Sequence, residues 1–442
     1  MNSRAAAHRI LAEVRAGTLS DLAATRTLPR VPRPDRGLAL EIAFGCLRLR
    51  ARLDAWIAAF ADRPVSRLDP PVRDWLRIGV YQLTELRTPD HAAVGETMRA
   101  ARAGLGRKRA GYVNAVLRAV AGGRDEARPF PSPDADPVAH LCAWGSHPEW
   151  LVRRWLERWP LSDVRRLVEQ HNRPPDVVLR LLDPAGGAPP TPAPPDPAPP
   201  EGVRFAPVPG WPRSFRLAEG TPAAALAGLR AVVQDPAASC VVDYVGARPA
   251  GPVLDVCAAP GTKALGLAAA AGVPVVALDI SRRRLGRLAA PARRLELPVS
   301  AVVADARRLP VGEAGTVLAD VPCTGTGVLR RRADARWRLD ERGLAALVTL
   351  QREIVDACAD AVRPGGLLVY STCSLEREEN EGQVDAFLER RPDYRREPPD
   401  AAAGAAAAPP PPGCVTPRGD LFVRPWITGT DGAYAARLRR DT

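Results

Sequence analysis

The stretch VLDVCAAPGTK, residues 253–263, indicates the fold of the C-terminal half of this 442-residue chain. The apolar run from Val253 to Cys257 predicts a buried strand, which enters a loop of small residues and then a helix. Small side chains let the backbone approach a ligand, and the N-terminus of the next helix offers free N–H donors. The stretch therefore predicts a ligand-binding loop between a strand and a helix.

Strands and helices are expected to alternate from about Gln234 onward. The expected strands are 253–257, 274–280, 299–305, 316–321 and 367–373. Such alternation predicts an α/β fold, a Rossmann-like domain with a mostly parallel sheet covered on both faces. Ligands of these sheets bind beyond the carboxyl ends of the strands. The residues at those ends that could do chemistry are Cys257, Asp279, Asp305, Asp320, Cys323 and Cys373.

The rest of the chain divides into further predicted domains. Residues 1–125 repeat apolar positions at helical spacing and predict an all-helical bundle of about five to seven helices. Residues 138–232 predict a small α+β connecting domain, interrupted by a Pro-rich insertion at 184–200. The segment 233–442 is the predicted catalytic domain, and its Ala- and Pro-rich part, 399–413, is expected to be a second insertion without chemistry.

Composition narrows the class of protein. The net charge is +12 and the isoelectric point is about 9.9, which favours a polyanionic partner. The excess of Arg is typical of a G+C-rich coding bias, so Lys263, one of only two lysines, is more informative. The eight cysteines include no C-x-x-C pair, and no apolar run approaches the roughly 18 residues of a membrane span. We therefore expect a reduced, cytoplasmic protein without a metal site or a membrane segment.

The strand-end acids suggest the type of cofactor. Asp279 lies 18 residues after Gly261, where a carboxylate can accept hydrogen bonds from both ribose hydroxyls. Asp305 could accept from the exocyclic amine of an adenine, although a helix N-cap is the alternative role for any single Asp. The loop matches neither the G-x-G-x-x-G nor the P-loop pattern. An adenosine cofactor without a pyrophosphate cradle fits S-adenosylmethionine.

Two thiols follow predicted strands, in the tetrapeptides DVPC (320–323) and STCS (371–374). A free cysteine is commonly a small buried apolar residue, which is what we expect of most other cysteines in the chain. Cys323 and Cys373 differ because both lie at the ligand edge. Two thiols and Asp320 beside a methyl donor suit methylation of cytosine at C5, where a thiolate adds to C6 and makes C5 nucleophilic.

These motifs resemble those of the bacterial RNA cytosine-C5 methyltransferases of the NOL/NOP/Sun group, and within it the RsmB (Sun/Fmu) subfamily. The resemblance covers nearly the whole chain, including GYVNAVLR (111–118), HPEWL (147–151) and VQDPAAS (233–239). It implies an S-adenosylmethionine-dependent enzyme acting on 16S ribosomal RNA, with a NusB-like RNA-binding domain at residues 1–125. We expect a monomer.

The resemblance also implies roles for residues. Cys373 would be the nucleophile, Cys323 would help to release the product, and Asp320 would contact both the cytosine and the cofactor. Lys263 and Arg330, Arg331 and Arg332 would lie near RNA. The residues expected to bind the methyl donor are Cys257, Ala258, Ala259, Pro260, Gly261, Thr262, Lys263, Asp279, Asp305 and Asp320.

Two positions depart from the family pattern, which usually has Ala where this chain has Val321 and Gly where it has Thr262. A β-branched residue is disfavoured at positive φ, so we expect Thr262 to adopt a negative φ and binding to be retained. Further candidates for RNA backbone contact are the runs 107–109 and 153–154, for which a solvated helix face is the alternative. Two other functions stay open: a cytosine-C5 methyltransferase of transfer RNA, and a non-catalytic RNA-binding factor.

Overall fold

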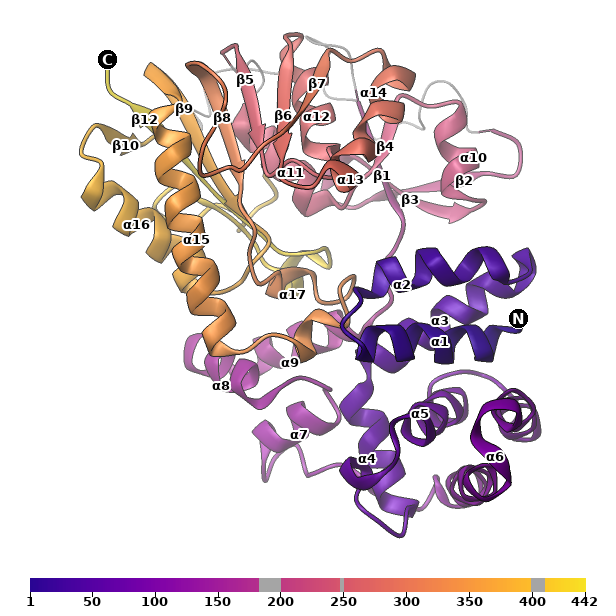
Figure 1. The fold of residues 1–442 in the computed structure, drawn as a ribbon. Helices are drawn as coiled ribbons and strands as arrows, with labels where there is room; N and C mark the ends of the chain where they lie inside the picture. The colour runs from indigo at the N-terminus through magenta and orange to yellow at the C-terminus, as the bar shows by residue number, and fades with distance from the viewer. Residues whose placement is uncertain (183–199, 247–249, 399–409) are drawn as a thin grey trace. The chain divides into compact units, whose positions relative to one another are not determined.

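The computed structural model describes residues 1–182, 200–246, 250–398 and 410–442 (Figure 1). Most of the predicted insertion 184–200, and of 399–413, lies outside the described residues. Two compact units are present: residues 1–174 together with Leu329–Leu339, and residues 175–328 together with Asp340–Thr442. In the described part of the chain, no helix is both long and apolar enough to cross a membrane.

The first unit is helical, as its sequence periodicity predicts. Buried apolar residues such as Ile42, Leu53 and Leu76 form its core. The longest helix reverses direction at Gly106, whose φ of 71° is non-helical. The helices are α1 (Ser3–Arg15), α2 (Ser20–Thr27), α3 (Arg36–Arg48), α4 (Arg50–Phe60), α5 (Pro70–Thr84), α6 (Asp90–Gly123), α7 (Pro137–Ala143), α8 (Glu149–Arg158) and α9 (Leu161–Asn172).

A short segment of the C-terminal half completes this unit. The guanidinium of Arg336 is fully buried and donates hydrogen bonds to the carbonyl oxygens of Arg48, Ser146 and His171, at 3.0 to 3.1 Å. The indole N–H of Trp337 donates to the carbonyl oxygen of Leu47 at 2.8 Å. Buried carbonyl oxygens need donors, so this segment satisfies acceptors that the helices alone leave open.

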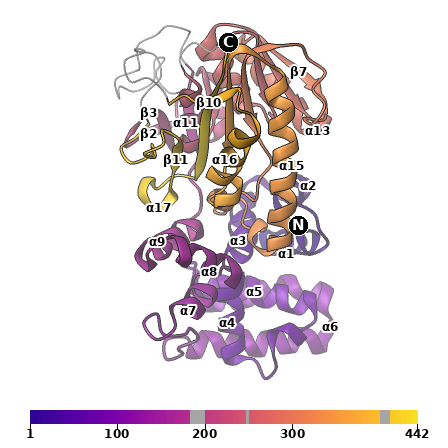
Figure 2. The same ribbon diagram turned by 90° about the vertical axis from the view of Figure 1, so that its left-hand side faces the viewer.

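The second unit contains the predicted α/β fold (Figures 1 and 2). Its large sheet has the order β10-β12-β9-β8-β5-β6-β7, with β11 paired to β12. The five strands from β9 to β7 are parallel, as expected. Strand β12 runs antiparallel to β9, and β10 and β11 each pair antiparallel with β12. The strands are β5 (Val253–Val256), β6 (Val275–Asp279), β7 (Val299–Val303), β8 (Ala314–Asp320), β9 (Val362–Thr372), β10 (Tyr394–Arg396), β11 (Leu421–Val423) and β12 (Ala433–Arg440).

Helices cover both faces of this sheet. Figures 1 and 2 show α15 and α16 over one face and α11 over the other. Leu318 and Val369 pack in the same core cluster as Val241 of α11, while the hydroxyl of Tyr370 faces α15 through Gln351. The helices are α11 (Pro236–Val245), α12 (Thr262–Ala271), α13 (Arg282–Leu285), α14 (Ala289–Leu295), α15 (Glu341–Asp360), α16 (Glu381–Arg390) and α17 (Pro425–Thr428).

A second, four-stranded antiparallel sheet belongs to the same unit, in the order β2-β3-β1-β4. It comprises β1 (Val178–Leu181), β2 (Arg204–Val208), β3 (Trp211–Glu219) and β4 (Ala231–Val233), with helix α10 (Pro222–Ala227) before β4. The predicted connecting region 138–232 is therefore shared: α7 to α9 belong to the first unit and these strands to the second. The domain limits given above stay a prediction.

Candidate active site

The loop between β5 and α12 that is predicted to bind the cofactor, here called the cofactor loop, begins at Cys257, one residue earlier than the sequence predicts. Strand β5 ends at Val256, and Cys257 has a φ of 63°, which is uncommon for a non-glycine residue. Gly261 has a φ of 103° and precedes the first turn of α12. A Cβ at Gly261 would lie 2.5 Å from Leu288 Cδ1, so both conformation and packing require glycine here.

Thr262 is the first residue of α12, and it is not among the described non-glycine residues with positive φ. This confirms the conformation expected from the sequence. Its hydroxyl accepts a hydrogen bond of 3.1 Å from the side-chain amide of Gln234, a contact that glycine could not make.

Asp279 ends β6 and holds the cofactor loop. Its Oδ2 accepts from the backbone N–H of Ala259 at 3.2 Å, and its Oδ1 accepts from the backbone N–H of Ser281 at 2.7 Å. Oδ2 keeps a lone pair for a ribose hydroxyl. The next side chain, Ile280, is 66% exposed although it is large and apolar. A carboxylate beside an exposed apolar side chain fits the ribose and base of an adenosine cofactor, and Ile280 was not predicted.

Asp305 follows β7 and is bound by Arg307 in this structure. Arg307 donates to it from the backbone and from the guanidinium, with Nη2 to Oδ2 at 2.7 Å. Hydrogen bonds from Arg307 lower the pKa of Asp305 to about 2, so its carboxylate is ionised at neutral pH. An ionised acceptor suits an adenine amine, but Arg307 competes for it.

The pairing of β8 and β9 brings the predicted catalytic residues together. The parallel register aligns Asp320 with Ser371, so the residues that follow each strand meet at one edge. The thiol sulfurs of Cys323 and Cys373 lie 3.3 Å apart. The hydrogen bond with Cys373, together with burial, raises the pKa of Cys323 well above its ordinary value. Cys323 therefore carries its proton at neutral pH.

Lys263 joins the cofactor loop to this edge. Its ammonium lies 2.7 Å from Asp320 Oδ2, and the hydroxyl of Ser371 donates to Oδ1 at 3.1 Å. Burial opposes the charge on Lys263, but the attraction and hydrogen bond of Asp320 outweigh it and raise its pKa. Interaction with Cys373 acts in the same direction. The side chain of Asp320 is thus held between two donors.

A buried glutamate supports the loop after Cys323, and the sequence did not reveal it. Glu379 Oε1 accepts from the backbone N–H of Thr324 at 2.9 Å and from the side-chain amide of Gln351 at 2.8 Å. Burial raises the pKa of Glu379 above its usual value. In the sequence, Glu379 stands in the run EREEN (376–380), which is typical of a solvated surface, so no local signal distinguishes it.

The arginines expected near RNA differ in exposure. Arg330 is buried, with 5% exposed, so its burial does not support an RNA contact in this structure. Arg331 is half-buried, and Arg332 is exposed and stays a candidate. Arg153 forms an ion pair with Glu149 one helical turn away, as expected of a solvated helix face.

The chain is similar to known methyltransferases over its whole length. A family description for 16S rRNA methyltransferase RsmB/F matches residues 246–439, and one for the NusB family matches residues 1–122. The Ribosomal RNA small subunit methyltransferase B of Thermus thermophilus is 36% identical, covering 99% of this chain and 97% of the relative. The chain belongs to the RsmB family.

Other relatives agree with this assignment. The Vibrio cholerae protein of the same name is 34% identical over 82% of this RsmB-family chain and 83% of its own length. Among solved structures, PH0851 has a TM-score of 0.75 at 23% identity, covering 100% of this chain and 99% of its own. NSun6 from Pyrococcus horikoshii has a TM-score of 0.51 at 18% identity, covering 67% of this chain and 98% of its own. These two likenesses concern the fold alone.

As a member of the RsmB family, the chain is an S-adenosylmethionine-dependent RNA methyltransferase. The residues at the strand ends fit this cofactor. Asp279 and Ile280 are placed where they would provide a ribose acceptor and an apolar contact, and the loop from Cys257 to Lys263 would provide a small-residue approach.

Proposed function

We propose that this protein transfers a methyl group to C5 of a cytosine in 16S ribosomal RNA, with Cys373 as the attacking nucleophile and Cys323 as the residue that helps release the product. The cofactor supplies an electrophilic methyl group on a sulfonium. The observation that carries the assignment of roles is the 3.3 Å contact between the two thiols at the strand ends.

The protonation of the two thiols supports the assignment. Because the pKa of Cys323 is raised well above its ordinary value, Cys323 keeps a proton that it can donate to the sulfur of Cys373. An accepting sulfur that interacts with the ammonium of Lys263 is the better candidate for a thiolate. The thiolate of Cys373 would add to C6 of the cytosine, and the new enamine makes C5 nucleophilic.

The later steps need a proton to leave C5 and the bond from sulfur to C6 to break. A base must take the C5 proton, and the electron pair of the broken bond returns to Cys373 as its thiolate. Cys323 lies 3.3 Å from Cys373 and carries a proton that can stabilise this departing thiolate, which is why we assign it to product release. Asp320, held by Lys263 and Ser371, is the acid group positioned to contact the ring of the cytosine. The target must leave its stack to reach these groups, as is usual for enzymes that modify a base.

The test is nucleoside mass spectrometry of unmodified 16S rRNA incubated with S-adenosylmethionine and the full-length protein. We expect 5-methylcytosine with the wild type and none with Cys373→Ala. Transfer RNA serves as a parallel substrate. Methylation of transfer RNA alone would overturn the substrate assignment, and RNA binding without methylation of either would favour a non-catalytic RNA-binding factor.

A further inference from the structure

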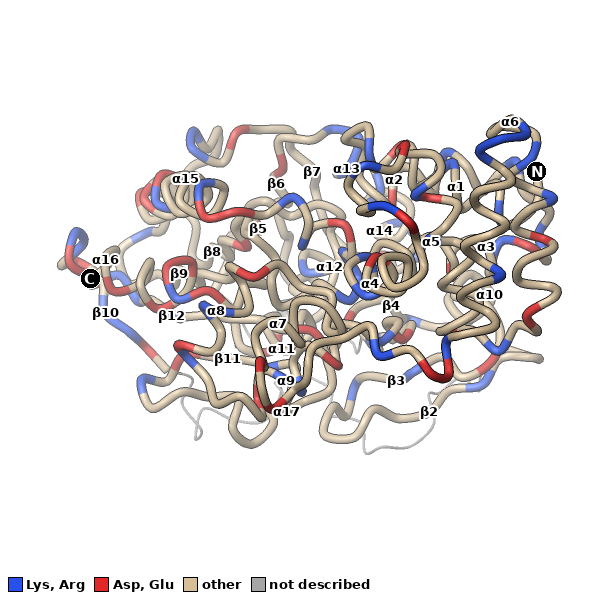
Figure 3. Tube along the Cα trace, turned by 90° about the horizontal axis from the view of Figure 1, so that it is seen from below, with Lys and Arg blue, Asp and Glu red and all other residues tan. Residues whose placement is uncertain are grey.

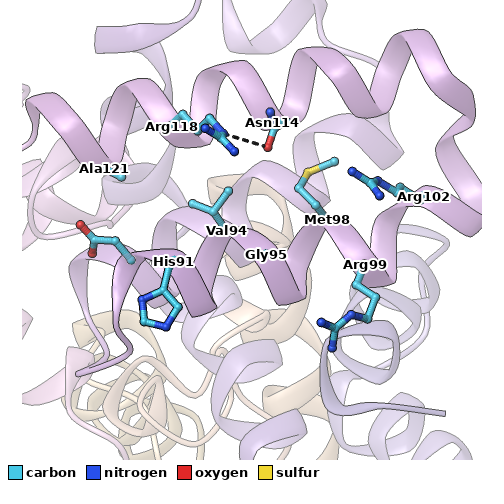
Figure 4. Close-up of a pocket in the computed structure, with 10 residues that line it drawn as sticks. His91, Val94, Gly95, Met98, Arg99, Arg102, Asn114, Arg118 and Ala121 are labelled. Carbon is cyan, nitrogen blue, oxygen red and sulfur yellow. Dashed lines mark hydrogen bonds between the residues drawn. The ribbon is translucent and has the colours of Figure 1, made fainter.

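The helical unit contains a pocket of about 610 Å³ that the proposed reaction does not use (Figure 4). It lies between the two limbs of α6, which fold back on each other at Gly106. Val94, Met98 and Arg102 line it from the first limb, and Asn114 and Arg118 line it from the second. All of these residues belong to the same compact unit.

The floor of the pocket is apolar and has open space at Gly95. Val94 and Met98 are 8% and 5% exposed, and Figure 4 shows both side chains directed toward the space between the limbs. Gly95 stands beside them without a side chain, and a Cβ built there would meet no atom within 4 Å. The open space at Gly95 beside this apolar lining can accept the edge of a nucleobase, and the thioether of Met98 is a favourable contact for an aromatic ring.

The rim of the pocket is basic. Arg102 and Arg118 are exposed, and Arg118 Nε donates to Asn114 Oδ1 at 3.5 Å. Arg102 forms no ion pair with any described residue. The one carboxylate in the lining, Asp90, is already paired with Arg124 at 2.7 Å. The rim therefore presents cationic groups that need an anion.

Further positive charge continues along the same helix. Arg107 and Lys108 are exposed at the turn between the two limbs, and Figure 3 shows the basic residues of α6 as blue segments. Arg99, also in the lining, is partly neutralised by Glu96 at 2.6 Å. Proteins that bind single-stranded nucleic acid combine basic side chains that contact phosphates with side chains on which bases pack. The rim supplies the first of these features, and the apolar lining, aliphatic rather than aromatic, supplies the second.

We propose that this pocket binds an unpaired nucleotide of the ribosomal RNA substrate, away from the cytosine that is methylated. Its base would lie on Val94 and Met98, and its flanking phosphates would contact Arg102 and Arg118. RNA is read largely at single-stranded loops whose bases can be turned out in this way. The identity of the RNA rests on the proposed function, whereas the pocket and its charges do not.

The test measures binding of a fluorescent single-stranded RNA, and of unmodified 16S rRNA, to the full-length protein across a salt series. Gly95→Leu fills the floor without changing charge, and should weaken binding about tenfold with an unchanged salt slope. The double variant Arg102→Ala with Arg118→Ala should weaken binding and reduce the log–log salt slope by roughly one for each lost phosphate contact. Arg26→Glu changes an exposed arginine on α2, outside the pocket, and controls for general charge.

Wild-type affinity in both Gly95→Leu and the double arginine variant would overturn the proposal. The proposal would also be overturned if inorganic phosphate or a mononucleotide bound to the pocket without displacing RNA, because the pocket would then be a small-anion site. Circular dichroism checks folding, and Gly95→Ala is the milder replacement if Gly95→Leu unfolds. Failure of the proposed function can be distinguished from failure of this proposal. If the proposed function is wrong, 16S rRNA incubated with the wild type contains no 5-methylcytosine, whatever the RNA affinities are.

Catalysis gives a second readout. In methylation assays the Gly95→Leu protein should show a raised KM for 16S rRNA and an unchanged kcat, because the pocket takes no part in the chemistry. A lower kcat with an unchanged KM would contradict a binding role.

Discussion

The ammonium of Lys263, from the cofactor loop, lies 2.7 Å from the carboxylate of Asp320 at the end of the next strand of the sheet. This contact links the loop predicted to bind the methyl donor to the edge that carries the two thiols. Lys263 is 19% and Asp320 26% exposed at the side chain, so the pair is partly shielded from water and screening. We expect the pair to control the geometry of the reaction.

Loss of Lys263 should therefore impair catalysis. Lys263→Met removes the cation and leaves Asp320 with only the hydroxyl of Ser371 as a partner. We expect kcat to fall by about 100-fold or more, a size typical of removing one positioned charged group. Ser371→Ala, which removes the weaker partner, should cost less. The measurement is initial rates against 16S rRNA, and near wild-type kcat in Lys263→Met would contradict this role.

Cys323→Ala should separate the two halves of the reaction. If Cys373 adds to the cytosine while Cys323 assists release, the variant should accumulate a covalent protein–RNA complex. A denaturing gel after incubation with RNA and S-adenosylmethionine would show it as a slower band. The double variant Cys323→Ala with Cys373→Ala is the control and should show none. Absence of the band in the single variant would count against the assigned roles.

Gly261→Ala should weaken cofactor binding. The added Cβ would stand 2.5 Å from Leu288 Cδ1 at a φ of 103°, so the loop must move. Calorimetric titration with S-adenosylmethionine should show affinity lowered about tenfold or more, since strain at such positions costs roughly 1–3 kcal/mol. Gly286→Ala is the matched control, because its Cβ meets no atom within 4 Å. Equal affinities in the two variants would exclude a special role for Gly261.

Asp255 should make the stability of the protein depend on pH. Burial, with the nearby charge of Asp320, raises the pKa of Asp255 to about 8. In the unfolded chain this carboxyl has its ordinary pKa near 4. Between these two pKa values the folded protein therefore holds a proton on Asp255 that the unfolded chain has lost. The stability that this proton contributes is fully present below about pH 4 and is lost as the pH rises toward 8.

Asp255→Asn imitates the protonated form and removes this dependence. We expect the Tm of the variant, measured relative to the Tm of the wild type, to be higher at pH 8 than at pH 5. Differential scanning calorimetry at both values measures it. A difference in Tm that is the same at both pH values would show that Asp255 is already ionised in the folded protein.

Local sequence was sufficient for much of the fold. The apolar runs at 253–257, 274–280 and 316–321 correspond to β5, β6 and β8 within two residues at each end. The helical periodicity of residues 1–125 likewise produced helices α1 to α6. These signals are local, because burial on both faces of a parallel strand requires a continuous apolar run and burial on one side of a helix requires a periodic one.

The pairing of distant segments was harder to predict from the sequence. The antiparallel strand β12 joins the sheet beside β9, and nothing in its own residues specifies that partner. The segment Leu329–Leu339 resembled a basic RNA contact, but the structure buries Arg336 against backbone carbonyl oxygens of the helical unit. The sequence does not distinguish these two roles, because an arginine has the same charge whether it contacts a phosphate or a carbonyl oxygen.

The sequence by itself determined the candidate reacting groups of this protein: Cys323 and Cys373 behind their strands, Lys263 after its loop and the acids at the strand ends. The tertiary structure decided how those groups act on one another. Only the register of β8 and β9 sets the thiols 3.3 Å apart, and only the folded chain raises the pKa of Cys323, through its hydrogen bond with Cys373 and its burial. The sequence gives the type of each residue, whereas the distances between side chains and their burial depend on which distant segments pack together.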